Sequence, residues 1–169
     1  MTESTLTPSR LWRRMTADQR LRAARAFWAE EQAADDQVQA VMLIAQQKKF
    51  RPKFVIGLDD ERRAKHLASM LSLPEALAAR ALVVYHLAEQ RDMMASFLDA
   101  LGLKHENGLI EDDEAKPAAE KIAPAVAAIA EKYPAEDVSL YLTTLVCQDP
   151  DTWGELRTQP QVMQPQVTQ

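Results

Sequence analysis

One histidine and two carboxylates stand close together in the sequence, at His86, Glu89 and Asp92. On a helix, residues three apart lie on neighbouring positions of one face, so His86 and Glu89 would lie one turn apart. An imidazole beside carboxylates can hold a small ligand, and carboxylate oxygens are ligands that Mg²⁺ prefers. These three residues are therefore the candidate ligand-binding site. The competing interpretation, which we favour for His86, is a buried core histidine with a hydrogen-bond partner.

The segment Glu89-Gln-Arg-Asp92 resembles half of the acidic pattern of the all-α nucleotide pyrophosphohydrolases. Those enzymes carry Glu-x-x-Asp on one helix and Glu-Glu-x-x-Glu on another. The second pattern is broken in this sequence, because Glu30-Glu31 is followed by Ala34 at the position of the third glutamate. A Mg²⁺-dependent phosphohydrolase is therefore kept as an alternative, and the sequence assigns no catalytic residue, no metal site and no cofactor.

A second segment, residues 48–54, interleaves cations with aromatic side chains. Its cations are the candidate partner-binding residues Lys48, Lys49, Arg51 and Lys53. Cations and aromatic rings together can hold phosphates and stack on bases. The sequence pI of about 5.3 argues against nucleic acid, because an acidic molecule repels it. Nucleic acid is therefore the third alternative, behind an acidic protein partner.

Charge is unevenly distributed along the chain. Residues 1–65 carry 13 Lys and Arg against 9 Asp and Glu, whereas residues 66–169 carry 7 against 16. This asymmetry suits an acidic partner or self-association between copies of the chain. Solvated faces that differ in charge without a function are the other explanation. We therefore expect another protein, or a second copy, as the partner.

Several classes of protein are excluded by their characteristic residues. No two of the four glycines lie within five residues of one another, so a glycine-rich phosphate loop is absent. Cys147 is the only cysteine, so no intramolecular disulfide is expected, and it is interpreted as a small hydrophobic residue. The first residues contain no apolar segment typical of a secretory signal, and no apolar run approaches the ~20 residues that span a bilayer. We expect a cytoplasmic protein that does not bind membranes.

Proline and N-cap residues divide the chain into segments whose apolar residues recur at helical spacing. These helix starts are Thr7-Pro8, Thr16, Pro74, Pro134 and Asp149-Pro150. The pattern predicts an all-α fold, a compact bundle of six to eight helices arranged as antiparallel helical hairpins, with a solenoid-like array as a variant. Residues 1–158 form a single domain in this prediction. Residues 159–169 form a Gln/Pro-rich flexible tail with nothing to bury.

Local details are also predicted. Thr16 and Gln19 have the spacing of a capping box, and Asn107-Gly108 is typical of a turn. Residues 75–90 are apolar nearly all round, which indicates a helix buried on several sides. Residues 50–58 are expected to form a mostly irregular connector with its apolar side chains tucked against helices. Core filling is expected for the methionines Met42, Met70, Met93 and Met94, and the alternative is that they line an adaptable binding groove.

These observations favour a non-catalytic protein-interaction or assembly module. A non-catalytic role is favoured partly by exclusion, since no phosphate loop, metal cluster or catalytic triad is recognisable in the sequence. An enzyme whose site is assembled from separated helices would give the same pattern, so catalysis stays open. The alternative function is a small-ligand or Mg-nucleotide-binding protein with its site at His86, Glu89 and Asp92.

Overall fold

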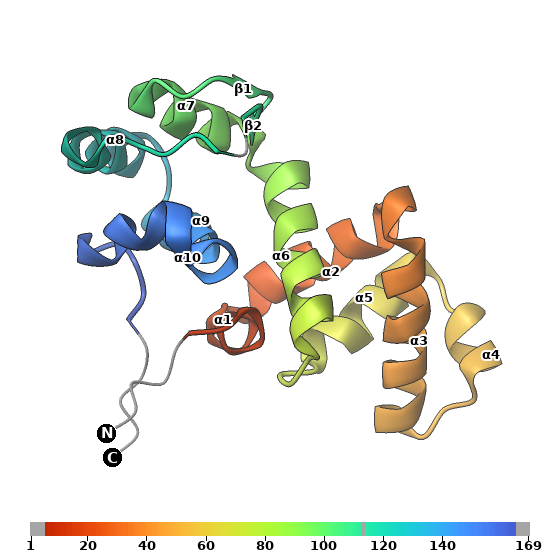
Figure 1. The fold of residues 1–169 in the computed structure, drawn as a ribbon. Coiled ribbons are helices and arrows are strands. Elements are labelled where there is room, and N and C mark those ends of the chain that lie inside the picture. Colours follow the sequence, from red (N-terminus) through yellow and green to blue (C-terminus); the bar gives the residue numbers. More distant parts are fainter. Residues whose placement is uncertain (1–5, 113, 165–169) are drawn as a thin grey trace, which may run out of the picture. The chain divides into compact units, whose positions relative to one another are not determined.

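The computed structural model describes residues 6–112 and 114–164. The described residues form ten α-helices, two short 3₁₀ helices and a two-stranded hairpin (Figure 1). The all-α prediction is confirmed. The helices outnumber the six to eight expected because several are only one or two turns long. Of the described helices, none is long and apolar enough to cross a membrane.

Contacts divide the chain into two compact units. Pro8–Ala88 forms the first, which we call the N-terminal unit. Glu89–Gln169 together with Met1–Thr7 forms the second, the C-terminal unit. The single domain over residues 1–158 and the solenoid-like variant both stay predictions.

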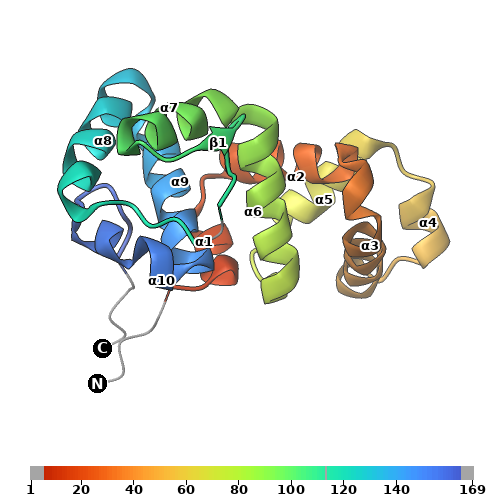
Figure 2. The same ribbon diagram turned by 45° about the horizontal axis from the view of Figure 1, so that its top comes forward.

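The N-terminal unit contains six helices and one 3₁₀ turn. They are α1 (Pro8–Arg14), α2 (Ala17–Ala29), η1 (Glu31–Ala33), α3 (Ala34–Lys48), α4 (Pro52–Ile56), α5 (Asp60–Ser69) and α6 (Glu75–Glu89). Helix α2 packs mainly against α5, and α3 lies beside α4 in both ribbon views (Figures 1 and 2). Helix α6 buries residues on several sides, as its apolar composition predicts.

Local sequence signals set several helix ends in this unit. The Thr16 hydroxyl accepts a hydrogen bond from the Gln19 backbone N–H at 3.1 Å, and the Gln19 side chain accepts from the Thr16 N–H at 3.0 Å. The predicted capping box is therefore confirmed. Helix α3 ends at Lys48, and the residue that follows, Lys49, has a left-handed conformation with φ of 58°. The chain then turns, and Pro52 opens α4 at its first helical position.

Large side chains fill the core of the N-terminal unit. Trp12, Phe27, Leu67 and Tyr85 have no exposed surface. The Trp12 indole N–H donates to the backbone oxygen of Met70 at 2.8 Å. A buried indole N–H needs such an acceptor, and this bond ties α1 to the residue that follows α5.

The C-terminal unit contains the remaining helices and the hairpin. They are α7 (Arg91–Leu101), β1 (His105–Glu106), β2 (Leu109–Ile110), α8 (Ala119–Lys132), α9 (Ala135–Gln148), α10 (Pro150–Trp153) and η2 (Gly154–Thr158). Helix α7 packs mainly against α8. Its Phe97 ring lies 5.8 Å from the ring of Tyr141 and 6.0 Å from that of Trp153, measured between centroids. Burial in this cluster raises the pKa of Tyr141.

The predicted turn at Asn107-Gly108 is confirmed and closes a β-hairpin. Asn107 has φ of 50° and Gly108 has φ of 90°, the positive values that a tight two-residue hairpin turn requires. The strands pair antiparallel, with Glu106 opposite Leu109. The sequence pattern did not indicate these strands because each has only two residues.

The beginning of the predicted tail packs against the rest of the C-terminal unit. Val162 is only 4% exposed, and the Met163 backbone N–H donates to the Thr143 hydroxyl at 3.0 Å. The expectation that this segment has nothing to bury is therefore wrong at Val162. Residues 165–169 lie outside the described residues.

Candidate functional site

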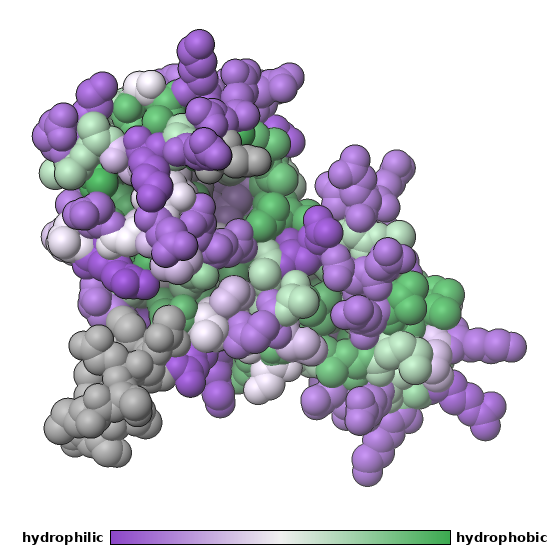
Figure 3. All heavy atoms as spheres, viewed as in Figure 1, coloured by the Kyte–Doolittle hydropathy of each residue, from purple (hydrophilic) through white to green (hydrophobic). Residues whose placement is uncertain are grey.

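Large apolar side chains are exposed on two neighbouring helices of the N-terminal unit. The exposed fractions are 63% for Val38 and 54% for Met42 on α3, and 53% for Phe54 and 61% for Ile56 on α4. We call these four residues the α3–α4 surface. Figure 3 shows hydrophobic side chains, in green, over these two helices, with hydrophilic side chains around them. Single exposed apolar side chains are ordinary, but a group on adjacent helices indicates a binding surface.

Helix α3 contributes two residues to this surface because its apolar stripe is wider than the face it buries. Its buried residues are Ala40, Val41, Ile44 and Ala45. Val38 and Met42 lie one turn apart at the edge of that face. The expectation that Met42 fills the core is therefore wrong, whereas Met70, Met93 and Met94 are buried as expected.

Helix α4 replaces the irregular connector that the sequence predicted. Arg51 is extended and Pro52 presets the helical φ, so the chain makes one short helix of five residues. Successive helical residues point about 100° apart, so the residues just before and just after an inward-facing residue point away from it to opposite sides. Val55 is that residue, with no exposed surface. Phe54 and Ile56 consequently face outward, and the expectation that they are tucked against helices is wrong.

An aromatic cluster lies at the turn between α3 and α4. The half-buried Phe50 ring lies 4.9 Å from the Phe54 ring and 5.5 Å from the His66 ring of α5, measured between centroids. Burial lowers the pKa of His66, and the nearby Lys48 ammonium lowers it further. His66 therefore favours its neutral form, which suits a ring packed edge-on against phenylalanine.

The predicted partner-binding cations surround this turn. Lys48, Lys49, Arg51 and Lys53 are all exposed. Within the described ranges, none of the four forms an ion pair with a carboxylate. Other cations of the same unit are paired, as Arg25 is with Glu61 at 2.6 Å. The turn is therefore a local positive charge that the unit itself leaves unneutralised.

The three residues of the predicted ligand site have different environments. His86 lies on α6 with 3% of its surface exposed. Glu89 ends the same helix and is exposed, and Asp92 is exposed in the first turn of α7. The burial of His86 fits the core-histidine interpretation. Ligand binding at these residues stays a prediction.

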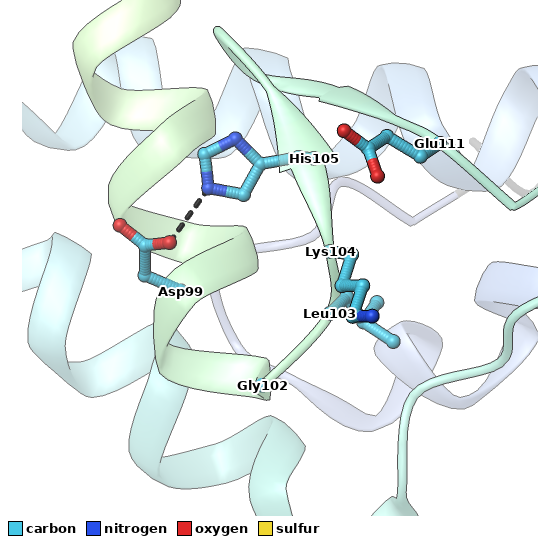
Figure 4. A pocket seen from close by; sticks show the side chains of 6 residues that line it. All are labelled: Asp99, Gly102, Leu103, Lys104, His105 and Glu111. Atoms are coloured by element: carbon cyan, nitrogen blue, oxygen red, sulfur yellow. Dashed lines mark hydrogen bonds and ion pairs between the residues drawn. The ribbon is translucent and has the colours of Figure 1, made fainter.

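A pocket of about 490 Å³ opens in the C-terminal unit (Figure 4). It is lined by Asp99, Gly102, Leu103, Lys104, His105 and Glu111. The His105 Nε2 lies 2.6 Å from the Asp99 carboxylate, and its Nδ1 accepts a hydrogen bond from the Gly108 N–H at 3.2 Å. Since Nδ1 accepts, Nε2 carries the proton that faces Asp99. The contact of Nε2 with Asp99 joins the hairpin to α7, whereas the bond from Gly108 to Nδ1 closes the hairpin turn onto its own first strand.

The His105–Asp99 pair was missed by sequence reasoning. The two residues are separated by Gly102, which has φ of 71° and ends α7 by reversing the chain. A histidine and an aspartate six residues apart form no recognisable motif, so no signal in the sequence indicates the contact. Among the described residues, no group of three or more His, Cys, Asp or Glu side chains could hold a metal ion.

Comparisons with protein families, with curated proteins and with solved structures give no match to this chain. Any functional assignment therefore depends on the residues described above. Among those residues, the α3–α4 surface groups four exposed apolar side chains, and the four cations beside it form no ion pair within the described part of the chain.

Proposed function

We propose that the chain is a non-catalytic protein-interaction module whose N-terminal unit binds a partner protein through the α3–α4 surface. The observation that carries this proposal is the exposure of more than half of each of four large apolar side chains on neighbouring helices. Water contact with such side chains is unfavourable, and burying them against a partner removes it. The four cations at the adjoining turn add a charged border to an apolar centre, as many protein interfaces have.

The expected free energy of binding favours a transient complex. Full burial of one Val, Ile, Met or Phe side chain contributes ~1.5–3 kcal/mol. These side chains are already about half buried, so a partner would gain roughly 1 kcal/mol from each, or about 4 kcal/mol in all. Association costs at least ~4 kcal/mol in lost translational and rotational freedom. The apolar surface alone roughly offsets that cost, so the neighbouring charges must add the attraction that makes binding net favourable.

The proposal is tested by placing a photo-crosslinking amino acid at residue 42 or 56 of the full chain in a cell lysate. Leu109 is the matched control position, since it is also apolar and 47% exposed but belongs to the C-terminal unit. Crosslinks to one discrete protein are expected from positions 42 and 56 and not from 109. Excess unlabelled chain should compete for that crosslink, whereas excess Met42→Ser/Ile56→Ser variant should not. Equal crosslinking from all three positions, or equal competition by the variant, would overturn the proposal.

A further inference from the structure

The partner can be described by its chemistry, and this step rests on the proposed function. Residues 37–58 contain four cations and no carboxylate. All four cations stand at the turn where α3 ends and α4 begins. The N-terminal end of α3 carries the exposed Asp35 instead, and the neighbouring Asp36 pairs with Arg80 at 2.8 Å. The surface is therefore polarised along α3, with a negative end, an apolar middle and a positive end.

The length of this polarised surface matches a short helix. Asp35 and Lys48 are separated by 13 positions, which at 1.5 Å per residue is about 20 Å along the axis. Val38 and Met42 form a row along α3, and Phe54 and Ile56 flank the buried Val55 on the two sides of the adjoining α4. Two adjacent helical elements that expose apolar side chains suit a third helix laid along them.

The same features argue against a lipid bilayer or a nucleic acid. A nucleic acid and a bilayer of anionic lipids both present negative charge along their whole length, which would repel the Asp35 end of α3. Bases gain from stacking on aromatic faces, yet three of the four exposed apolar residues, Val38, Met42 and Ile56, have no ring. An aliphatic surface is better covered by the aliphatic stripe of another helix.

We infer that the partner presents an amphipathic helix whose apolar stripe covers the α3–α4 surface and whose acidic residues gather at the end nearest the C-terminus of α3. The stripe excludes water from Met42 and Ile56. The acidic end neutralises the cations that the unit leaves without ion pairs. A partner helix of about 15 residues is long enough to reach from one end of α3 to the other.

The test uses designed peptides and the full chain. The probe is a fluorescent helical peptide of about 15 residues, with leucines at helical spacing and glutamates concentrated at one end. One control peptide has the same composition with its leucine stripe scrambled, and another has lysines in place of the glutamates. Binding is followed by fluorescence anisotropy, and backbone NMR shifts locate it on the chain. We expect binding of the probe, shifts at Val38, Met42, Phe54 and Ile56, and affinities roughly tenfold lower for both controls.

Charge reversal at the turn supplies a matched pair of variants. Arg51→Glu/Lys53→Glu changes the first turn of α4, where acidic residues suit the helix N-terminus, so folding should be retained. Lys104→Glu/Lys116→Glu makes the same change in net charge on exposed lysines of the C-terminal unit. The first variant should bind the acidic probe roughly tenfold more weakly, and the second should bind it as the original chain does. Unchanged thermal unfolding of both variants would show that folding is intact.

Other outcomes separate this inference from the proposed function. Tighter binding to anionic phospholipid vesicles or single-stranded DNA than to the probe would overturn the inference. Equal binding of all three peptides would also overturn it, since neither stripe nor charge would then matter. If the probe fails while crosslinking from residues 42 and 56 still captures one competed protein, the partner chemistry is wrong and the interaction function stands. If both fail, the interaction function is wrong as well.

Discussion

Helices α3 and α7 each carry five large apolar residues but bury them to different extents. Helix α7 buries every large apolar residue it has, namely Met93, Met94, Phe97, Leu98 and Leu101. It packs against α8, which has 14 residues, and contacts both strands of the hairpin. Helix α3 has 15 residues and leaves Val38 and Met42 exposed, because its neighbour α4 has only five. The difference follows from the arrangement of the apolar residues, which α7 keeps on one face, and from the length of the element that covers each helix.

The polar groups of the two regions show the same contrast. Beside α7, the two ring nitrogens of His105 meet the Asp99 carboxylate and the Gly108 N–H within hydrogen-bond distance. At the α3–α4 turn, the four cations are exposed and form no ion pair within the described part of the chain. One region thus satisfies its side chains internally, while the other leaves both apolar and charged groups available to a partner.

Truncating one methionine in α7 and one in α3 gives the strongest test of the difference in burial between these two helices. Met93→Ala should lower the free energy of unfolding by ~2–5 kcal/mol, because it removes a side chain that is 2% exposed and leaves a cavity. Met42→Ala should change it by about 0.5 kcal/mol or less, since its side chain is 54% exposed. Chemical denaturation of both variants measures the difference. Similar losses from the two changes would mean that Met42 is part of the core.

A pair of glycine substitutions tests how tightly the hairpin is held against α7. A Cβ at Gly108 would lie 2.8 Å from the Cβ of Met94, and its φ of +90° is unfavourable for any other residue. Gly108→Ala should therefore cost ~1–3 kcal/mol of stability. Gly154→Ala is the control, because a Cβ there meets nothing within 4 Å, and its stability should change by less than about 1 kcal/mol. Thermal unfolding of the two variants decides whether the hairpin is a fixed part of the C-terminal unit.

Local features were predictable from the sequence because their causes are local. The capping box joins Thr16 to Gln19, and the Asn107-Gly108 turn depends on two adjacent residues that tolerate positive φ. The all-α class followed from apolar spacing repeated over many segments. The cations at 48–53 are exposed in the structure, as is usual for charged side chains, which are costly to bury.

Features that depend on neighbouring elements were not predictable. A five-residue helix is too short to show a helical period, so α4 was interpreted as a connector. The exposure of Phe54 and Ile56 depends on what α4 lies against, which the spacing of its own residues does not reveal. The pairing of His105 with Asp99 similarly requires the chain reversal at Gly102 and the hairpin that follows.

The smallest expected effect is the pH dependence contributed by His66 beside the α3–α4 turn. Its pKa is lowered by burial and by Lys48, from an ordinary value of 6.5. The unfolded chain therefore binds more protons than the folded chain between the lowered pKa and 6.5. Stability contributed by neutral His66 is present above pH 6.5 and is lost as the pH falls through the folded pKa. An NMR titration of the His66 ring should give a midpoint below that of a histidine in an unfolded peptide.

The variant His66→Gln separates this contribution from other titrating groups. Glutamine does not titrate, so the decline in denaturation midpoint from about pH 7 to about pH 5 should be smaller than in the original chain. Lys48→Gln removes the lesser cause while burial remains, so the His66 pKa should rise only part of the way to its ordinary value. A His66 midpoint at or above the unfolded value would show that the ring is more open to water than its packing against Phe50 indicates. The aromatic cluster beside the α3–α4 turn would then be loosely packed. It would differ even more from His105, whose two ring nitrogens lie within hydrogen-bond distance of Asp99 and Gly108.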